Sequence, residues 1–155
     1  MVAGTTVQES ITIDIIEKLE EIDGPPDYSA ALTVYRMGAN IMGVPRLPCA
    51  IVLDVGADED DGAANGTIQC TRRFDIILGV SSYDSGWPAD VQAACADVAA
   101  KLREDWTRGG IAQTTRVDFE DIWDAPADGE MPVAGGHVSV TVVYRHLYDD
   151  PTFAV

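Results

Sequence analysis

The clearest alternation of hydrophobic and polar positions in this chain lies near its end, in residues 136–145. Successive side chains of a β-strand point to opposite faces of a sheet, so residues two apart share a face. One face of this stretch is apolar and consists of Val138, Val140, Val142 and Tyr144. The other face is interrupted only by Val143 and otherwise carries His137, Ser139, Thr141 and Arg145. The pattern predicts a long strand with one packed face and one polar face.

Residues 67–80 repeat this alternation and predict a second long strand of the same sheet. Its apolar positions are Ile68, Cys70, Phe74, Ile76, Leu78 and Val80. Arg72 falls among these apolar positions, where a buried cation would need a carboxylate partner. Two interpretations of Arg72 stay open. Either it pairs inside the fold, or its end of the strand runs past the core to meet another subunit.

Two stretches show the three- and four-residue spacing of amphipathic helices. The first spans residues 7–22, with an apolar stripe of Val7, Ile11, Ile15, Leu19 and Ile22. Two prolines at 25–26 end it. The second opens near Pro88, with an apolar stripe of Val91, Ala94, Cys95, Val98, Leu102 and Trp106. Two glycines at 109–110 stop this helix, and both helices are expected to cover the packed face of the sheet.

Shorter stretches complete the predicted sheet. Residues 32–36 form a short candidate strand, and the almost wholly apolar residues 49–55 are expected near the centre of the sheet. Residues 117–124 are acidic enough to lie at a sheet edge. The sequence therefore predicts an α+β fold in one domain, residues 1–155. It would have a single, mostly antiparallel sheet of about 4–5 strands with two helices packed on one face.

The segments outside these elements are three loops and a tail, residues 37–48, 56–66, 125–135 and 147–155. The second loop carries four consecutive carboxylates, Asp58 to Asp61. It does not match a calcium-binding EF-hand loop. Counting back from Gly62 puts Ala57 at the first ligand position, and no glutamate stands at the twelfth. We expect a hydrated loop that orders against a partner.

The tail is too short to fold alone and would usually fray. Its aromatic residues, Tyr148 and Phe153, suggest docking on another surface instead, and both interpretations stay open. Together with the acidic loop and Arg72, the tail forms the predicted subunit or partner interface. The candidate residues are Asp58, Glu59, Asp60, Asp61, Arg72, Tyr148, Asp149, Asp150 and Phe153.

The charge balance is unusual, because 10 Lys and Arg stand against 26 Asp and Glu, giving a formal charge of −16. Such a charge keeps a protein soluble and repels nucleic acid in general. It argues against a protein that grips DNA, but it suits a channel through which DNA passes without sticking.

No stretch reaches the roughly 18 consecutive apolar residues of a membrane span. The N-terminus lacks the basic and apolar regions of a signal peptide. Cys49, Cys70 and Cys95 are odd in number and lie in apolar runs, so we interpret them as small buried residues rather than disulfide partners. These features predict a soluble protein made in a cytoplasm.

The sequence shows no recognisable catalytic motif. Its two histidines, His137 and His146, fall on opposite faces of one strand, and neither has a cysteine at a zinc-site spacing. A nucleophile elbow, a phosphate loop and a dinucleotide fingerprint are all lacking. We therefore expect no enzyme activity, no cofactor and no metal site.

The layout of the predicted elements resembles the tail terminator (tail completion) proteins of long-tailed bacteriophages. This layout is an N-terminal amphipathic helix, a long hairpin with a protruding tip, a second helix and a closing strand pair. The closing stretch, residues 142–151, carries the resemblance furthest, with the sequence VVYRHLYDDP. The resemblance covers nearly the whole chain in layout and brings no catalytic residues with it.

The resemblance implies a ring, usually of six subunits, that caps the head-proximal end of the tail tube. Such a ring stops tube polymerisation and joins the tail to the head connector. The implied partners are other copies of the chain, the tail tube protein and a head-completion or connector protein. Double-stranded DNA would pass through the lumen without specific binding. The implied location is the tail-neck region of the virion, after assembly in the host bacterial cytoplasm.

Two other classes of protein stay open. One is a different neck or tail-tube structural protein, such as a head–tail adaptor, which could stack into tubes by itself. The other is a small intracellular enzyme or ligand-binding module, which would be a monomer or dimer with a defined pocket.

Overall fold

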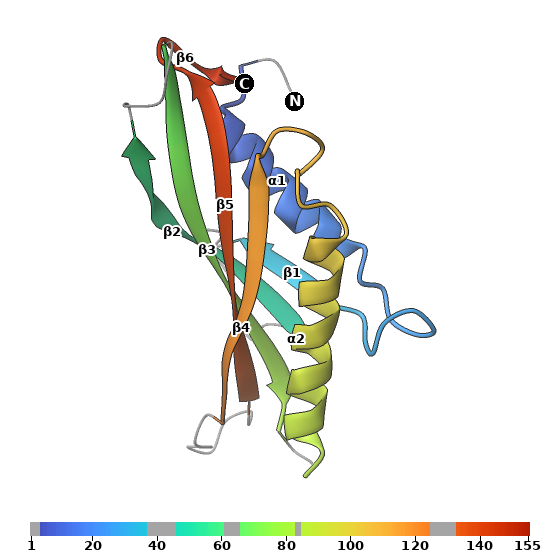
Figure 1. Ribbon diagram of the computed structural model, residues 1–155. Coiled ribbons are helices and arrows are strands. Elements are labelled where there is room, and N and C mark those ends of the chain that lie inside the picture. Colours follow the sequence, from blue (N-terminus) through green and yellow to red (C-terminus); the bar gives the residue numbers. More distant parts are fainter. Residues whose placement is uncertain (1–3, 37–45, 61–65, 83–84, 125–132) are drawn as a thin grey trace.

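The computed structural model of the chain describes residues 4–36, 46–60, 66–82, 85–124 and 133–155. Within these residues, six strands form one twisted sheet and two helices lie along one of its faces (Figure 1). The helices are α1 (Val7–Glu20) and α2 (Trp87–Arg103). The strands are β1 (Thr33–Arg36), β2 (Cys49–Asp60), β3 (Thr67–Ser81), β4 (Thr114–Asp124), β5 (Val133–Leu147) and β6 (Asp150–Ala154). The predicted α+β class is confirmed.

The sheet has the strand order β1-β2-β3-β5-β4, with β6 beside one end of β5. The pairing of β1 with β2 is parallel and the other pairings are antiparallel, so the sheet is mixed. β4 lies at an edge, as its acidic sequence predicts. The prediction of four to five strands missed β6, because the tail folds back onto β5. Pairing of β4 with β5 stops at Val143, and β6 pairs with the segment of β5 that β4 leaves uncovered.

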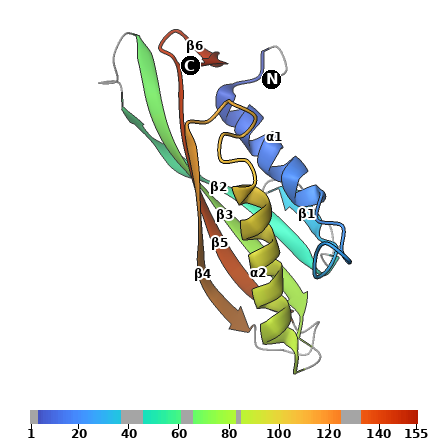
Figure 2. The ribbon, with the colours of Figure 1, turned by 45° about the vertical axis from the view of Figure 1, so that its right-hand side comes forward.

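The two long amphipathic strands bury the faces that the alternation predicts. Val138, Val140, Val142 and Tyr144 of β5 are at most 3% exposed. Cys70, Phe74, Ile76, Leu78 and Val80 of β3 are at most 6% exposed. α1 contacts β1, β2 and β6, whereas α2 contacts β3, β4 and β5. Figure 2 shows both helices on this packed side, so neither of the described helices lies over the opposite face of the sheet.

The two helices begin and end for local reasons, and one boundary differs from the prediction. Thr6 caps α1, because its side chain accepts a hydrogen bond from the Glu9 amide at 3.2 Å. α2 ends at Arg103, so Trp106 is not part of its apolar stripe and is 57% exposed. The prediction for Trp106 is wrong because the chain turns away from the helix axis before this residue. Arg108, two residues after Trp106, is buried instead.

Arg108 joins the two helices from inside the fold. Its side chain is fully buried, and Nη1 lies 3.1 Å from Oδ2 of Asp14 in α1. Nη2 donates to the backbone carbonyls of Leu102 and Asp105 at the end of α2. Burial raises the pKa of the Asp14 carboxyl, and the charge of Arg108 partly offsets this. The Arg108 guanidinium thus satisfies the Leu102 carbonyl, one of those that the last turn of a helix leaves without intrahelical partners.

The predicted loop 56–66 begins later than expected. Residues 56–60 belong to β2 and pair with residues 69–73 of β3, beyond a register shift between Asp54 and Gly56. Gly56 has a φ of 131°, which only glycine adopts readily, so the bulge depends on this residue. The acidic side chains are tolerated in β2 because none of the described strands pairs with its outer edge here.

The other two predicted loops are only partly described. Residues 133–135 begin β5, which corrects the predicted loop 125–135 at its end, and residues 46–48 lead into β2 without strand structure. Residues 37–45, 61–65 and 125–132 lie outside the described part of the chain. Neither of the helices described is long and apolar enough to cross a membrane.

Gly136 sets how closely α2 approaches the sheet. A Cβ atom at this position would lie 2.6 Å from Sγ of Cys95 and 2.8 Å from Cγ1 of Val91, both in α2. We expect Gly136→Ala to lower the free energy of unfolding by about 1–3 kcal/mol, because overpacking forces the helix outward. Urea denaturation measures this loss. In a Cys95→Ala background the loss should be smaller, and an equal loss in both backgrounds would contradict the close approach.

Candidate partner-binding surface

Most of the predicted interface residues meet at one end of the sheet. We call this the hairpin end and define it by residues 57–60 of β2, residues 66–72 in and before β3, and residues 144–155. The turn after β5 is tied to the start of β3, because the Tyr148 amide donates to the Gly66 carbonyl at 2.7 Å. In Figure 1 this end also carries the C-terminus and the beginning of α1. Asp61 lies outside the described residues.

β6 has an inverted distribution of polar and apolar side chains. Asp150, Thr152 and Ala154 are partly buried, whereas Pro151 and Phe153 point outward. Tyr148, Phe153 and Val155 are 68%, 55% and 51% exposed. Large apolar side chains gathered at a surface mark interaction sites more often than scattered ones do. The backbone of the tail thus docks on its own sheet, while its apolar side chains face solvent.

The backbone of β6 is held by only a few bonds. His146 pairs with Ala154, Leu147 pairs with Asp150, and the Val155 amide donates to the Arg145 carbonyl at 3.2 Å. Oδ1 of Asp150 accepts from the amide and hydroxyl of Thr152 at 2.9 and 2.5 Å, which lowers the pKa of the Asp150 carboxyl. The outer edge of β6 has no strand partner in the described part of the chain.

Acidic residues flank this apolar surface. Asp58, Glu59 and Asp60 are exposed on β2, and Asp149 is exposed in the turn before β6. Glu59 lies opposite Cys70 and therefore on the side of the sheet that carries the helices, whereas Asp58 and Asp60 face the other side. The hairpin end therefore combines exposed aromatic side chains with a concentration of negative charge.

Arg72 pairs inside the fold, which was the first of its two predicted alternatives. Its Nε lies 2.8 and 2.9 Å from the two carboxylate oxygens of Asp54 on β2. The side chains are 16% and 28% exposed. Gln8 of α1 also donates to Asp54 at 3.1 Å. The ion pair therefore connects β3, β2 and the beginning of α1.

The face of the sheet without helices is polar, as predicted, and several of its cations contact neighbouring acceptors. Asp75 lies 3.1 Å from Nε of Arg73 and 3.0 Å from Nε2 of His137. Arg116 lies 2.8 Å from Asp118. Arg145 donates to Oε1 of Gln69 at 3.0 Å. Such pairing limits the net field of this face, although the whole chain is strongly acidic.

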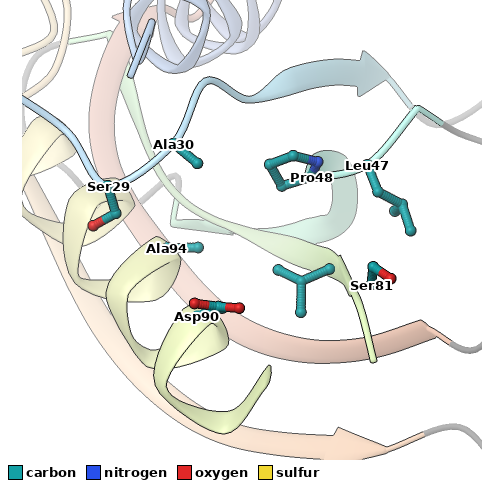
Figure 3. A pocket seen from close by; sticks show the side chains of 8 residues that line it. Ser29, Ala30, Leu47, Pro48, Ser81, Asp90 and Ala94 are labelled. Carbon is teal, nitrogen blue, oxygen red and sulfur yellow. The ribbon is translucent and has the colours of Figure 1, made fainter. Parts of the chain in front are cut away.

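A pocket of about 310 Å³ lies at the other end of the fold (Figure 3). It is lined by Ser29, Ala30, Leu47, Pro48, Val80, Ser81, Asp90 and Ala94. Asp90 and Ala94 of α2 face Leu47, Pro48 and the end of β3 across the pocket. Asp90 is the one ionisable side chain among these described lining residues, so they supply no acid–base pair. It is large enough for a small ligand.

The structure brings together one set of side chains that the sequence did not reveal. Glu59, Cys70 and His146 come from three neighbouring strands, and their potential ligand atoms all lie within 4.8 Å of one another. The two histidines do lie on opposite faces, as predicted. However, a motif of zinc ligands closely spaced in the sequence does not detect ligands that come together from different strands. The sequence offered only two signals: Cys70 falls on the packed face of its strand, and His146 falls within the other long strand.

Burial affects the protonation of the Cys70 thiol and of the neighbouring Tyr144 phenol. It raises the pKa of the Cys70 thiol and raises the pKa of the Tyr144 phenol, which contacts that thiol, to about 12. Both groups therefore carry their protons at neutral pH. Cys49 and Cys95 are also buried free thiols, in agreement with the prediction that the cysteines are small core residues.

The chain matches no protein-family model, and no curated protein is similar enough to count as a relative. Its function must therefore be argued from the surface features above.

The Arg72–Asp54 pair should stabilise the hairpin end. A double-mutant cycle with Arg72→Ala and Asp54→Ala should give a coupling free energy of about 1 kcal/mol, because both side chains are largely shielded from water. The control cycle uses Arg116 and Asp118, whose side chains are 77% and 46% exposed. Its coupling should be close to zero. Equal couplings in urea denaturation would show that Arg72 does not hold the hairpin end.

Proposed function

We propose that this protein is a virion structural protein resembling a tail terminator. It forms a ring, usually of six copies, that caps the head-proximal end of the tail tube. The ring stops tube polymerisation and joins the tail to the head connector in the neck of the virion, after assembly in the bacterial cytoplasm. The observation that carries the proposal is β6. At one end of the molecule it presents an apolar outer face and an edge with which no other described strand pairs.

The exposed tail supports assembly because burying its side chains would be favourable. Tyr148, Phe153 and Val155 are each more than half exposed, although Asp150, Thr152 and Ala154 of β6 are partly buried. Aromatic side chains are enriched among the residues that dominate protein–protein binding. A strand edge with free backbone groups can also accept a strand from another chain. In this proposal, the exposed tail binds a neighbouring copy in the ring and the tail tube protein.

The polar face of the sheet supports a role beside a DNA channel. Its cations are engaged with neighbouring acceptors, as in the pairs Arg73–Asp75 and Arg116–Asp118. Paired cations offer little to phosphate groups, and the chain as a whole carries a formal charge of −16. DNA would therefore slide past such a surface without specific binding.

One observation favours a second candidate function. The pocket between α2, the end of β3 and the residues before β2 has the size of a small-molecule site, which fits a ligand-binding module. Such a protein would be a monomer or dimer. A different neck protein or a tube subunit is the remaining structural alternative, and it would form rings that stack.

The state of assembly separates these functions. Light scattering over a concentration series, with negative-stain images of the same sample, should show rings of about six copies that do not stack. Open-ended tubes would instead identify a tube subunit. If the purified protein is a monomer, it should still bind the tips of isolated tail tubes. A monomer that fails to bind tube tips would overturn the proposal and favour the ligand-binding module.

The apolar face of the tail can be tested in the same assay. We expect the double variant Tyr148→Ser/Phe153→Ser to assemble at least about tenfold more weakly, because hot-spot aromatics carry much of the binding free energy. Its unfolding free energy should change by less than about 0.5 kcal/mol, since both side chains face solvent. Trp106→Ser is the matched control, because Trp106 is equally exposed but lies outside the hairpin end. Unchanged assembly of the double variant would remove β6 from the interface.

A further inference from the structure

Three potential metal ligands converge on the packed side of the sheet at the hairpin end. Glu59 of β2 and Cys70 of β3 are direct cross-strand partners. On the other side of β3, Cys70 pairs with Tyr144 and Ile68 pairs with His146, so His146 lies diagonally across from Cys70. The carboxylate oxygen, the thiol sulfur and an imidazole nitrogen lie within 4.8 Å of one another. β3 therefore carries one ligand between two strands that each supply another.

The Leu147 carbonyl favours a tautomer of His146 that suits metal binding. Its Nδ1 lies 2.7 Å from the carbonyl oxygen of Leu147, so Nδ1 carries the proton and donates it to that carbonyl. This leaves the lone pair on Nε2. A hydrogen bond from one ring nitrogen to a backbone carbonyl is the usual device that fixes the tautomer of metal-binding histidines. Packing also restrains the ring, because His146 is 9% exposed and its centroid lies 6.3 Å from that of Tyr144.

We propose that Glu59, Cys70 and His146 form a binding site for a divalent transition-metal ion, with zinc as the ion that fits best. Zinc accepts sulfur, nitrogen and oxygen ligands together, whereas magnesium and calcium prefer oxygen ligands alone. Tetrahedral zinc holds its ligands about 2.0–2.3 Å from the metal, which sets them roughly 3.3–3.7 Å apart. An inward movement of about 1 Å therefore closes the site. Three protein ligands leave the fourth position to water.

The surroundings provide access and partial charge balance. Cys70 is 1% exposed, but Glu59 is exposed, so the ion enters from the side of β2. Arg72 lies close enough to stabilise a negative charge on the Cys70 sulfur. Asp150 of β6 lies close enough to interact with His146. On binding, the sulfur–hydrogen bond of Cys70 is replaced by a metal–sulfur bond, and the proton passes to solvent. The thiolate and the Glu59 carboxylate neutralise the charge of the divalent ion.

The test uses the full-length protein after treatment with a chelator. Cobalt(II) serves as the spectroscopic probe, because a cobalt–thiolate bond produces a charge-transfer absorption that oxygen ligands do not produce. We expect this absorption to saturate at one cobalt per chain, and excess zinc to abolish it. Calorimetric titration with zinc should give a dissociation constant in the micromolar range or tighter.

The variants separate this site from nonspecific binding to acidic groups. Cys70→Ala, His146→Gln and Glu59→Gln should each weaken zinc binding at least about tenfold. Glu59→Gln is the decisive variant, because Glu59 is exposed and its replacement should leave folding intact. Cys49→Ala and His137→Gln are matched controls, since neither residue belongs to the cluster, and both should bind zinc as the parent protein does.

Two results would overturn the proposal. One is the absence of a thiolate absorption with cobalt. The other is a zinc affinity that Glu59→Gln leaves unchanged in a protein that remains folded. Both results concern metal binding alone, so neither would contradict the proposed ring function. Conversely, a protein that binds zinc tightly but stays monomeric and fails to bind tube tips would contradict the ring and not the zinc site.

Discussion

The uninterrupted pairing of β3 with β5 is the constraint on which the rest of the structure depends. Every residue of β3, from Thr67 to Ser81, pairs with a residue of β5, from Leu147 back to Val133. A slip of one residue would turn every apolar side chain of one strand to the polar face, so the two packed faces fix this register. β4 and α2 cover only part of the pair. The remaining length projects as the hairpin end and provides the edge on which β6 docks.

Alternation with a period of two predicted β3, β5 and their buried faces, because only one face of each strand packs against the helices. Spacing of three to four residues predicted the helices, because each of them also buries only one side. Local pattern failed where tertiary pairing decides the outcome. Asp58 to Asp60 have low strand propensity, yet they extend β2 because β3 supplies backbone partners. The tail likewise has too few residues to specify a strand, and the exposed edge of β5 recruits it. Neither partner is visible within a short window of sequence.

The candidate surface was predictable as a set of residues but not as a site. Aromatic residues in a short acidic tail suggested a contact, and the structure places the tail at the same end of the sheet as the acidic end of β2, far away in sequence. Arg72 shows the limit of parity arguments, because parity indicated that it needs a carboxylate but could not select Asp54. The cluster of Glu59, Cys70 and His146 was still less predictable from the sequence. Its members share no motif spacing, and only the combined registers of two strand pairs bring them together.

The two proposals concern the same few residues of backbone, and this links them physically. The carbonyl that orients His146 belongs to Leu147, which is also the residue that pairs with Asp150 at the start of β6. A partner that holds β6 in place therefore also holds the carbonyl that fixes the imidazole. A metal ion bound by His146 restrains the same turn in return. We therefore expect the two binding events to be coupled, and by linkage any coupling would change both affinities by the same factor. The short connection between β5 and β6 is the element through which that coupling passes.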